Sequence, residues 1–296
     1  MASILTTVPR KRTKFPPPGA FLQHRVITGD NWWSLATKYG RTDPWDIIEF
    51  NFRTRDAREV NWYMESYLGC HFAASDGKNF RFDSSDEPGL VYIPPSTWTR
   101  SEDLRLRSMV ASALSGPVIA RLNVHHVGRA IFGTTLAAVA IRVLEGEIDV
   151  VVDSTMRTWE AEYDSGTDIL HLGFANASST TRKALIVHEA VHAALDIKAV
   201  SGMTIAESES LAYVVQSFYV REHTLEPDVY RLTDPEDGSD RNPWRDRVYE
   251  LAWDMAATLS KGTQPTSIEW LALDHAVRRH PKYKGFAGNM AAFDGI

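Results

Sequence analysis

The spacing of apolar residues near the start of the chain predicts two short strands that enclose two helices. A β-prone run at 24–27 leads into a Thr-Gly-Asp turn, where Asp30 can cap the helix that follows. Apolar residues then recur at helical spacing over 33–39 and again over 45–50, where an Asp-Pro pair starts the second helix. A second β-prone run, at 90–93, ends at two prolines. The predicted order is strand, helix, helix, strand.

After Trp98 the pattern changes, and it predicts a mostly helical domain that contains one small sheet. Helical spacing dominates as far as Glu145, and the apolar run at 130–143 is typical of a buried helix. Three β-prone segments follow, at 148–152, 158–163 and 169–172. Further helices are predicted over 180–195, 207–220, 243–259 and 267–277. Together the two patterns predict an α+β protein.

We expect three parts in the chain: a disordered basic tail over 1–20, a first domain over 21–98 and a second domain over 99–296. The length of 296 residues suits two domains of ordinary size. The basic residues of the tail precede prolines and not the apolar run of a Sec-type signal peptide. The sequence therefore leaves localisation open between the cytoplasm and export by another route. Its apolar runs fall short of the ~20 residues that cross a bilayer, so we expect no membrane span.

Composition narrows the classes of partner. Hydrophobic residues make up 44% of the chain and charged residues 24%, which is ordinary for a folded globular protein. The net charge of −6 lacks the basic excess of a protein that neutralises many phosphates, so nucleic acid is not an expected partner. The single cysteine, Cys70, excludes an internal disulfide and a cysteine-based zinc site.

The most informative motif is H-E-x-x-H, formed by His188, Glu189 and His192 on a predicted helix. Four helical residues advance by about 400°, so the two imidazoles lie about 40° apart and one turn apart on one face. Such a pair can hold one zinc ion. Glu189 can then take a proton from a water whose pKa the ion has lowered to about 7. The motif therefore predicts a catalytic Zn²⁺ site with Glu189 as the general base.

A catalytic zinc site needs a third protein ligand and keeps one position for water. The next predicted helix offers Glu207 and Glu209, and either carboxylate can complete the site. The glutamate that is not a ligand can hydrogen-bond a histidine ligand from behind. Asp196, one turn beyond His192, is a second candidate for that supporting role, with a solvated residue near the helix end as the alternative.

The region 147–219 resembles the gluzincin branch of the zincin metallopeptidases. In that family H-E-x-x-H is followed, on a second helix, by a glutamate with a small residue three positions later. Glu209 with Ala212 satisfies this rule. Glu207 with Ser210 satisfies it too, but the E-x-x-A-Y form is more similar to the family. The resemblance thus implies Glu209 as the third ligand and leaves Glu207 as the alternate.

The same resemblance implies an edge strand that pairs with an extended peptide substrate and a side chain that stabilises an oxyanion. The sequence places the substrate strand at Ile169, Leu170, His171 and Leu172, with an ordinary sheet strand as the alternative. The oxyanion candidates are Tyr213, Tyr219 and His223, which can equally be structural.

The first domain contains the local sequences HRVITGDNWWSLATKYG and GLVYIPP. With the strand, helix, helix, strand order they resemble a LysM domain, a βααβ module that binds N-acetylglucosamine polymers such as peptidoglycan or chitin. The glycan contacts that this resemblance implies are Gly29, Asp30, Asn31 and Trp32. The alternative is that Asp30 only caps a helix and Trp32 only fills the core. The segment at about 53–88 departs from the family as a long insertion near the sugar groove.

These observations predict a zinc-dependent hydrolase, a metallopeptidase that cleaves a peptide or protein substrate. Its LysM-like domain would dock it on cell-wall glycan or on a partner assembly. Two alternatives remain open from the sequence. The chain could be a non-catalytic LysM adaptor with a degenerate zincin fold, or it could be a delivered toxin or effector protease.

Overall fold

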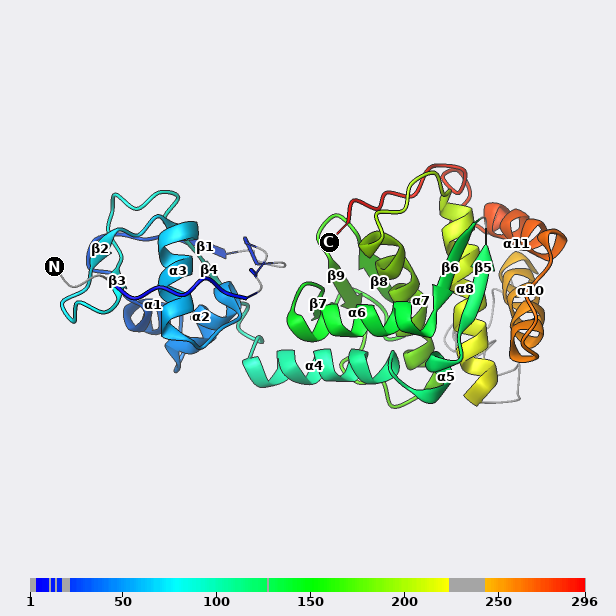
Figure 1. The fold of residues 1–296 in the computed structure, drawn as a ribbon, viewed down its shortest axis with the longest axis horizontal. Helices are drawn as coiled ribbons and strands as arrows, with labels where there is room; N and C mark the ends of the chain where they lie inside the picture. The colour runs from blue at the N-terminus through cyan, green and yellow to red at the C-terminus, as the bar shows by residue number, and fades with distance from the viewer. Residues whose placement is uncertain are drawn as a thin grey trace. The chain divides into compact units, whose positions relative to one another are not determined.

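The computed structural model describes residues 4–10, 12–13, 15–17, 22–126, 128–223 and 243–295, with side chains from 247 onward in the last range. The chain divides into two compact units, Met1–Leu104 and Arg105–Ile296. Each unit has its own core of buried apolar side chains. Helices and small separate sheets make up both units, which confirms the coarse α+β class (Figure 1). The boundary falls inside a helix, slightly beyond the position predicted after Trp98.

The first unit contains the predicted strand, helix, helix and strand, with additional elements in the predicted insertion. Its elements in chain order are β1 (Leu22–Arg25), α1 (Trp32–Lys38), α2 (Pro44–Phe52), α3 (Ala57–Leu68), β2 (Phe72–Ala73), β3 (Phe80–Arg81) and β4 (Leu90–Ile93). Strands β1 and β4 pair antiparallel, with Leu22 opposite Ile93. Helix α3 and the β2–β3 hairpin occupy the segment predicted as an insertion.

Asn31, and not Asp30, caps helix α1. The side chain of Asn31 accepts a hydrogen bond from the Ser34 N–H, and the Ser34 hydroxyl oxygen accepts one from the Asn31 N–H, both at 2.9 Å. Asp30 instead accepts from the Ile27 N–H at 3.0 Å and lies 2.8 Å from Nε2 of His24. The prediction of Asp30 as the cap was wrong by one residue, because its carboxylate closes the preceding turn.

The described residues of the segment predicted as a disordered tail contact the first unit. The ring centroid of Phe15 lies 5.1 Å from that of Tyr67. The hydroxyl of Tyr67 donates a hydrogen bond to the carbonyl of Thr13 at 3.3 Å. Aromatic contact of this kind removes apolar area from water and so stabilises the packed conformation of the segment. Lys11 and Lys14, which belong to the predicted basic tail, lie outside the described residues.

The second unit begins within α4 (Arg100–Ala113) and surrounds a three-stranded sheet with helices. The further elements are α5 (Pro117–Ala120), β5 (Asn123–His126), β6 (Arg129–Phe132), α6 (Gly133–Glu145), β7 (Asp149–Val152), β8 (Ala161–Asp164), β9 (Ile169–Leu172), α7 (Thr180–Ile197), α8 (Ile205–His223), α10 (Pro243–Ser260) and α11 (Ser267–Arg279). Helix α7 packs against α6, α8 and β8 (Figure 1). None of the helices in the described ranges is long and apolar enough to span a membrane.

The sheet order is β7–β9–β8, which corrects the predicted substrate strand. Strand β9, whose residues are Ile169, Leu170, His171 and Leu172, pairs parallel with β7 on one side and antiparallel with β8 on the other. Its backbone groups are therefore engaged by two neighbours, and it cannot accept a third strand. The sheet ends instead at β8, the strand that precedes β9 in the chain.

A hairpin lies in the stretch that the sequence predicted to be mostly helical. Strands β5 and β6 pair antiparallel, and α6 begins at Gly133, inside the apolar run predicted as one helix. Glycine is required at that junction because a Cβ there would lie 2.3 Å from the carbonyl oxygen of Ile119. The first residues of the apolar run thus form a strand, and the remainder forms the buried helix.

Candidate metal centre

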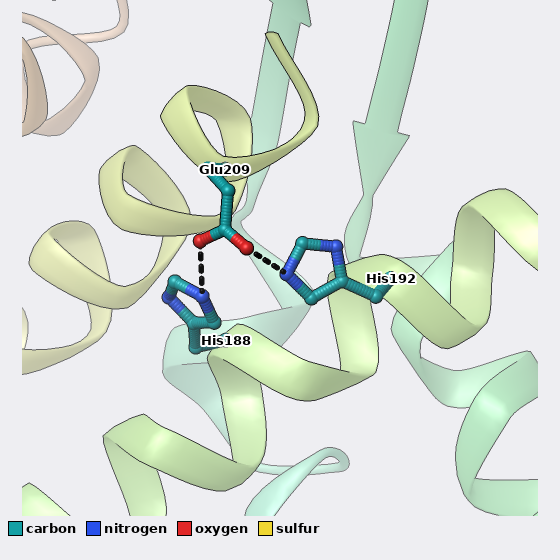
Figure 2. Close-up of side chains that lie close together, drawn as sticks. All are labelled: His188, His192 and Glu209. Atoms are coloured by element: carbon teal, nitrogen blue, oxygen red, sulfur yellow. Dashed lines mark ion pairs between the residues drawn. The ribbon is translucent and has the colours of Figure 1, made fainter. Parts of the chain in front are cut away.

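Helices α7 and α8 bring two histidines and one glutamate together (Figure 2). The Ser179 side chain caps α7 at its N-terminus, and His188 and His192 follow on one face of that helix. Nε2 of His188 lies 3.3 Å from Oε2 of Glu209, and Nε2 of His192 lies 3.7 Å from Oε1. One donor atom from each residue lies within 4.8 Å of the other two.

The far side of each imidazole is held by a hydrogen bond. Nδ1 of His188 lies 2.9 Å from Oε1 of Gln216, an atom that only accepts hydrogen bonds. Nδ1 of His192 lies 2.9 Å from the hydroxyl oxygen of Ser208. His188 therefore carries a proton on Nδ1, whereas the Ser208 hydroxyl can donate to or accept from Nδ1 of His192. Both rings present Nε2 to the carboxylate of Glu209. Metal-ligating histidines are usually oriented in this way by a partner behind the ring.

This donor set fits zinc. Two imidazole nitrogens and one carboxylate oxygen are the protein ligands of one common type of catalytic zinc site, with the fourth position left for water. His188 is 6% exposed, and the side chains of His192 and Glu209 are each 13% exposed. The cluster thus combines the ligand types, their spacing and a nearly buried setting that a zinc ion requires.

Glu189 lies between the two histidines in sequence and is also buried. Its Oε2 accepts a hydrogen bond from the backbone N–H of Tyr163, on strand β8, at 2.9 Å. Burial raises the pKa of Glu189 to about 7. A carboxyl group with a pKa near neutrality is suited to exchange protons in both directions.

The pKa values of the three clustered residues depart from their ordinary values, and not all in the same direction. Burial lowers the pKa of His192 to about 4, so this ring is neutral at pH 7. For Glu209 the penalty of burial, which would raise the pKa, is outweighed by the hydrogen bond with His188 and the nearby imidazoles, and the pKa lies well below its ordinary value. For His188 burial lowers the pKa, but the hydrogen bond with Glu209 and the two carboxylates give a net increase. The opposite pKa shifts of His188 and Glu209 thus arise in part from their hydrogen bond with each other.

Two residues predicted to support the site have other roles. Oε2 of Glu207 accepts hydrogen bonds from the N–H and the hydroxyl of Thr204, at 2.7 and 2.9 Å, and so caps the start of α8. Glu207 is therefore neither the alternate ligand nor a partner of a histidine. Asp196 accepts from the hydroxyl of Tyr163 at 2.8 Å and from the N–H of Gly295 at 3.1 Å. Both acids are occupied away from the ligand cluster.

One of the three oxyanion candidates lies at the ligand cluster. The ring of Tyr213 packs edge-on against that of His188, with centroids 4.7 Å apart. Nδ1 of His223 donates to the carbonyl of Tyr219 at 2.8 Å, near the end of α8. Tyr219 lies ten residues beyond Glu209, about 15 Å along the helix axis. Tyr219 and His223 are therefore structural residues of α8.

The sequence did not identify four residues that contact or electrostatically influence the cluster of His188, His192 and Glu209: Ser208, Gln216, Lys282 and Tyr283. Gln216 follows Glu209 by seven residues, which returns it to the same helix face, so its position could have been inferred from the spacing. The hydroxyl of Tyr283 donates to Oε2 of Glu209 at 2.7 Å. Lys282 is exposed, and its charge lowers the pKa of the ligands and of Glu189. No local pattern marks either residue after α11.

The first unit uses most of the predicted glycan contacts within its own fold. The side chain of Asp30 closes a turn, and that of Asn31 caps α1. Trp32 is 8% exposed and belongs to the core, as the alternative interpretation held. Gly29 has a φ of 101°, which a turn of this shape requires of glycine. The neighbouring Trp33, the second residue of α1, is 66% exposed, so its ring is accessible to a ligand.

Comparisons with models of protein families, with curated proteins and with solved structures give no match for this chain.

Proposed function

We propose that this protein is a zinc-dependent hydrolase that cleaves peptide bonds. The observation that carries the proposal is the convergence of His188, His192 and Glu209, with donor atoms within 4.8 Å, beside the buried carboxyl of Glu189. Two separate helices supply these groups, and the histidines have hydrogen-bonded partners behind them. An arrangement of this kind matches the requirements of a catalytic zinc site.

His188, His192 and Glu209 would hold the ion. When bound, zinc polarises a carbonyl group and lowers the pKa of water to about 7. Glu189 takes the proton of the attacking water and delivers it to the leaving amine, which its pKa of about 7 allows. Tyr163 keeps one oxygen of Glu189 in place through its backbone N–H while the proton moves.

The substrate is an extended peptide that pairs with the outer edge of β8, the edge that faces away from β9. The Tyr163 N–H points toward Glu189 and hence away from the neighbouring strand β9. Because backbone groups alternate along a strand, the Ala161 N–H faces the same side. An incoming peptide can add to this edge by hydrogen bonds from its main chain, which places its scissile bond near Glu189. This role for β8 replaces the one predicted for β9.

The first unit would recruit the enzyme to its substrate. Its order of strand, helix, helix and closing strand, with β1 paired to β4, supports the LysM-like interpretation of its local sequences. N-acetylglucosamine polymers are the proposed ligand. A protein assembly is the alternative, because α3 and the β2–β3 hairpin occupy the region near the expected sugar groove.

A peptidase assay with and without metal tests the proposal. Protein purified without chelator is offered an unstructured protein and a mixture of short peptides, before and after zinc removal. We expect cleavage that stops on zinc removal and returns when zinc is restored. Zinc binding without cleavage of either substrate would favour the non-catalytic adaptor. Cleavage that persists in the metal-free protein would contradict a zinc mechanism.

A further inference from the structure

The chain returns to the ligand cluster after helix α11. Tyr283, which lies 74 residues after Glu209, is 2% exposed, and its hydroxyl donates to Oε2 of Glu209 at 2.7 Å. Hydrogen bonds between a hydroxyl and an ionised carboxylate are among the stronger ones in proteins. The buried ring cannot turn its hydroxyl toward solvent without leaving the core. The contact is therefore a fixed feature of the folded unit.

A second hydroxyl, that of Tyr213, hydrogen-bonds to Tyr283, and the Glu209 carboxylate fixes the direction of both hydrogen bonds. The hydroxyl oxygens of Tyr213 and Tyr283 lie 3.0 Å apart. Since the carboxylate of Glu209 can only accept, Tyr283 is the donor to it, and the oxygen of Tyr283 accepts from Tyr213. Burial, together with the neighbouring Tyr213 and Glu209, raises the pKa of Tyr283 well above its ordinary value. The result is a chain of two hydroxyls that ends on the carboxylate.

The same segment also fixes the helix that carries Glu209. The carbonyl of Asn289 accepts a hydrogen bond from the Ile205 N–H, and the carbonyl of Ala287 accepts from the Ala206 N–H, each at 2.9 Å. These N–H groups belong to the first turn of α8, where no partner within the helix exists. Glu209 projects from the following turn. Segment 283–289 thus holds both the backbone of α8 and the side chain of its metal-binding residue.

We propose that Tyr283 is a positioning residue of the metal centre, which holds the carboxylate of Glu209 toward Nε2 of His188 and His192. The inference rests on the proposed zinc site. Without the hydroxyl of Tyr283, the carboxylate of Glu209 loses a hydrogen-bond donor and can rotate more freely. Zinc binding must then order this carboxylate, which makes the free energy of zinc binding less favourable. Substitution of such a partner behind a ligand typically lowers metal affinity by about 10–100-fold.

The test compares Tyr283→Phe with Tyr219→Phe, a buried tyrosine on α8 about 15 Å from Glu209. Zinc affinity is measured by competition with a chelating dye, and the visible spectrum of the Co²⁺-loaded protein reports the ligand geometry. We expect Tyr283→Phe to bind zinc ~10–100-fold more weakly, with an altered Co²⁺ spectrum. Tyr219→Phe should match the wild type in both measurements.

A double-mutant cycle separates positioning from a general loss of structure. If Tyr283 acts through Glu209, Tyr283→Phe should not weaken zinc binding further in a Glu209→Ala background. If the wild type binds zinc and Tyr283→Phe binds it with the same affinity, this inference is overturned and the proposed site stays intact. An equal loss in both backgrounds would overturn it as well, by showing an effect that does not pass through Glu209. A wild-type protein that binds no zinc would overturn both.

Discussion

The backbone N–H of Tyr163 donates a hydrogen bond of 2.9 Å to Oε2 of Glu189. This contact ties the end strand of the sheet to the helix that carries both histidines. The hydroxyl of the same tyrosine donates to Asp196, one turn beyond His192, at 2.8 Å. Tyr163, on the strand that we propose for substrate binding, therefore contacts α7 twice: its backbone binds Glu189, the proposed general base, and its side chain binds Asp196.

Replacement of Glu189 by glutamine should separate turnover from metal binding. The amide retains the shape of the side chain and can still accept the hydrogen bond from Tyr163, but it cannot take a proton. We expect Glu189→Gln to keep its zinc and to lose turnover by about 100-fold or more. Zinc content and the rate of peptide cleavage measure the two effects. Full activity in this variant would contradict the proposed mechanism.

The buried carboxyl of Glu189 should also make stability depend on pH. Its pKa of about 7 lies above the ordinary value of 4.5, so between these pH values the folded state binds more protons than the unfolded state. The free energy of unfolding of the metal-free protein should therefore fall as pH rises through this window. One pKa unit corresponds to ~1.4 kcal/mol, so the raised pKa of Glu189 contributes about 3 kcal/mol to the free energy of unfolding below this window.

Denaturant unfolding of the metal-free wild type and of Glu189→Gln at pH 5 and pH 8 measures this contribution. As pH rises from 5 to 8, the wild type should lose more stability than Glu189→Gln. Only the wild type has a buried carboxyl group at this position that ionises in this range. Parallel pH profiles for the two proteins would show that Glu189 titrates normally.

The hydrogen bonds behind the histidines should contribute to metal affinity. Gln216→Leu removes the acceptor of His188, and Ser208→Ala removes the hydrogen-bond partner of His192. Each substitution should weaken zinc binding by about 10–100-fold. Ser217→Ala is the control, since that hydroxyl donates a hydrogen bond to the backbone carbonyl of Tyr213 on the same helix. Equal affinities for Gln216→Leu and Ser217→Ala would contradict the role given to Gln216.

The adjacent residues Trp32 and Trp33 should differ sharply in their contribution to folding. Trp32 packs edge-on against Phe52 and Phe82 in the core, whereas Trp33 is exposed. We expect Trp32→Ala to lower the free energy of unfolding by about 3–5 kcal/mol. Trp33→Ala should stay within about 0.5 kcal/mol of the wild type. Similar losses from both substitutions, measured by denaturant unfolding, would contradict the described packing of α1.

Trp33 also allows a test of glycan binding in a folded protein. We expect the full chain to sediment with insoluble peptidoglycan or chitin, and Trp33→Ala to remain more in the supernatant because an exposed aromatic face is lost. A wild-type chain that stays in the supernatant with both polymers would indicate that the first unit docks on protein instead.

Part of the fold follows from local sequence signals. Pro44 after an aspartate marked the start of α2, and helical spacing marked α1 and α7. The position of β9 inside its sheet could not be inferred, because strand order depends on contacts between segments that share no sequence signal. The β5–β6 hairpin was missed because an apolar run crosses from β6 into α6, and short apolar runs suit either structure.

In the candidate site, too, some residues could be predicted from the sequence and others could not. His188 and His192 were predictable because their spacing alone places them on one helix face. The choice between Glu207 and Glu209 was not settled by spacing, since two helical residues lie about 200° apart and only the packing of α8 on α7 decides which one faces the histidines. Tyr283 was beyond prediction because it reaches Glu209 only through the tertiary fold.

Zinc content per chain in three matched proteins tests the central claim most directly. The wild type, Glu209→Ala and Glu207→Ala are purified without chelator, loaded with zinc, freed of excess metal and assayed by elemental analysis. The account predicts about one zinc per chain in the wild type and in Glu207→Ala, and loss of most of it in Glu209→Ala. A wild type that retains no zinc, or a Glu209→Ala protein that retains the full amount, would contradict the site described here.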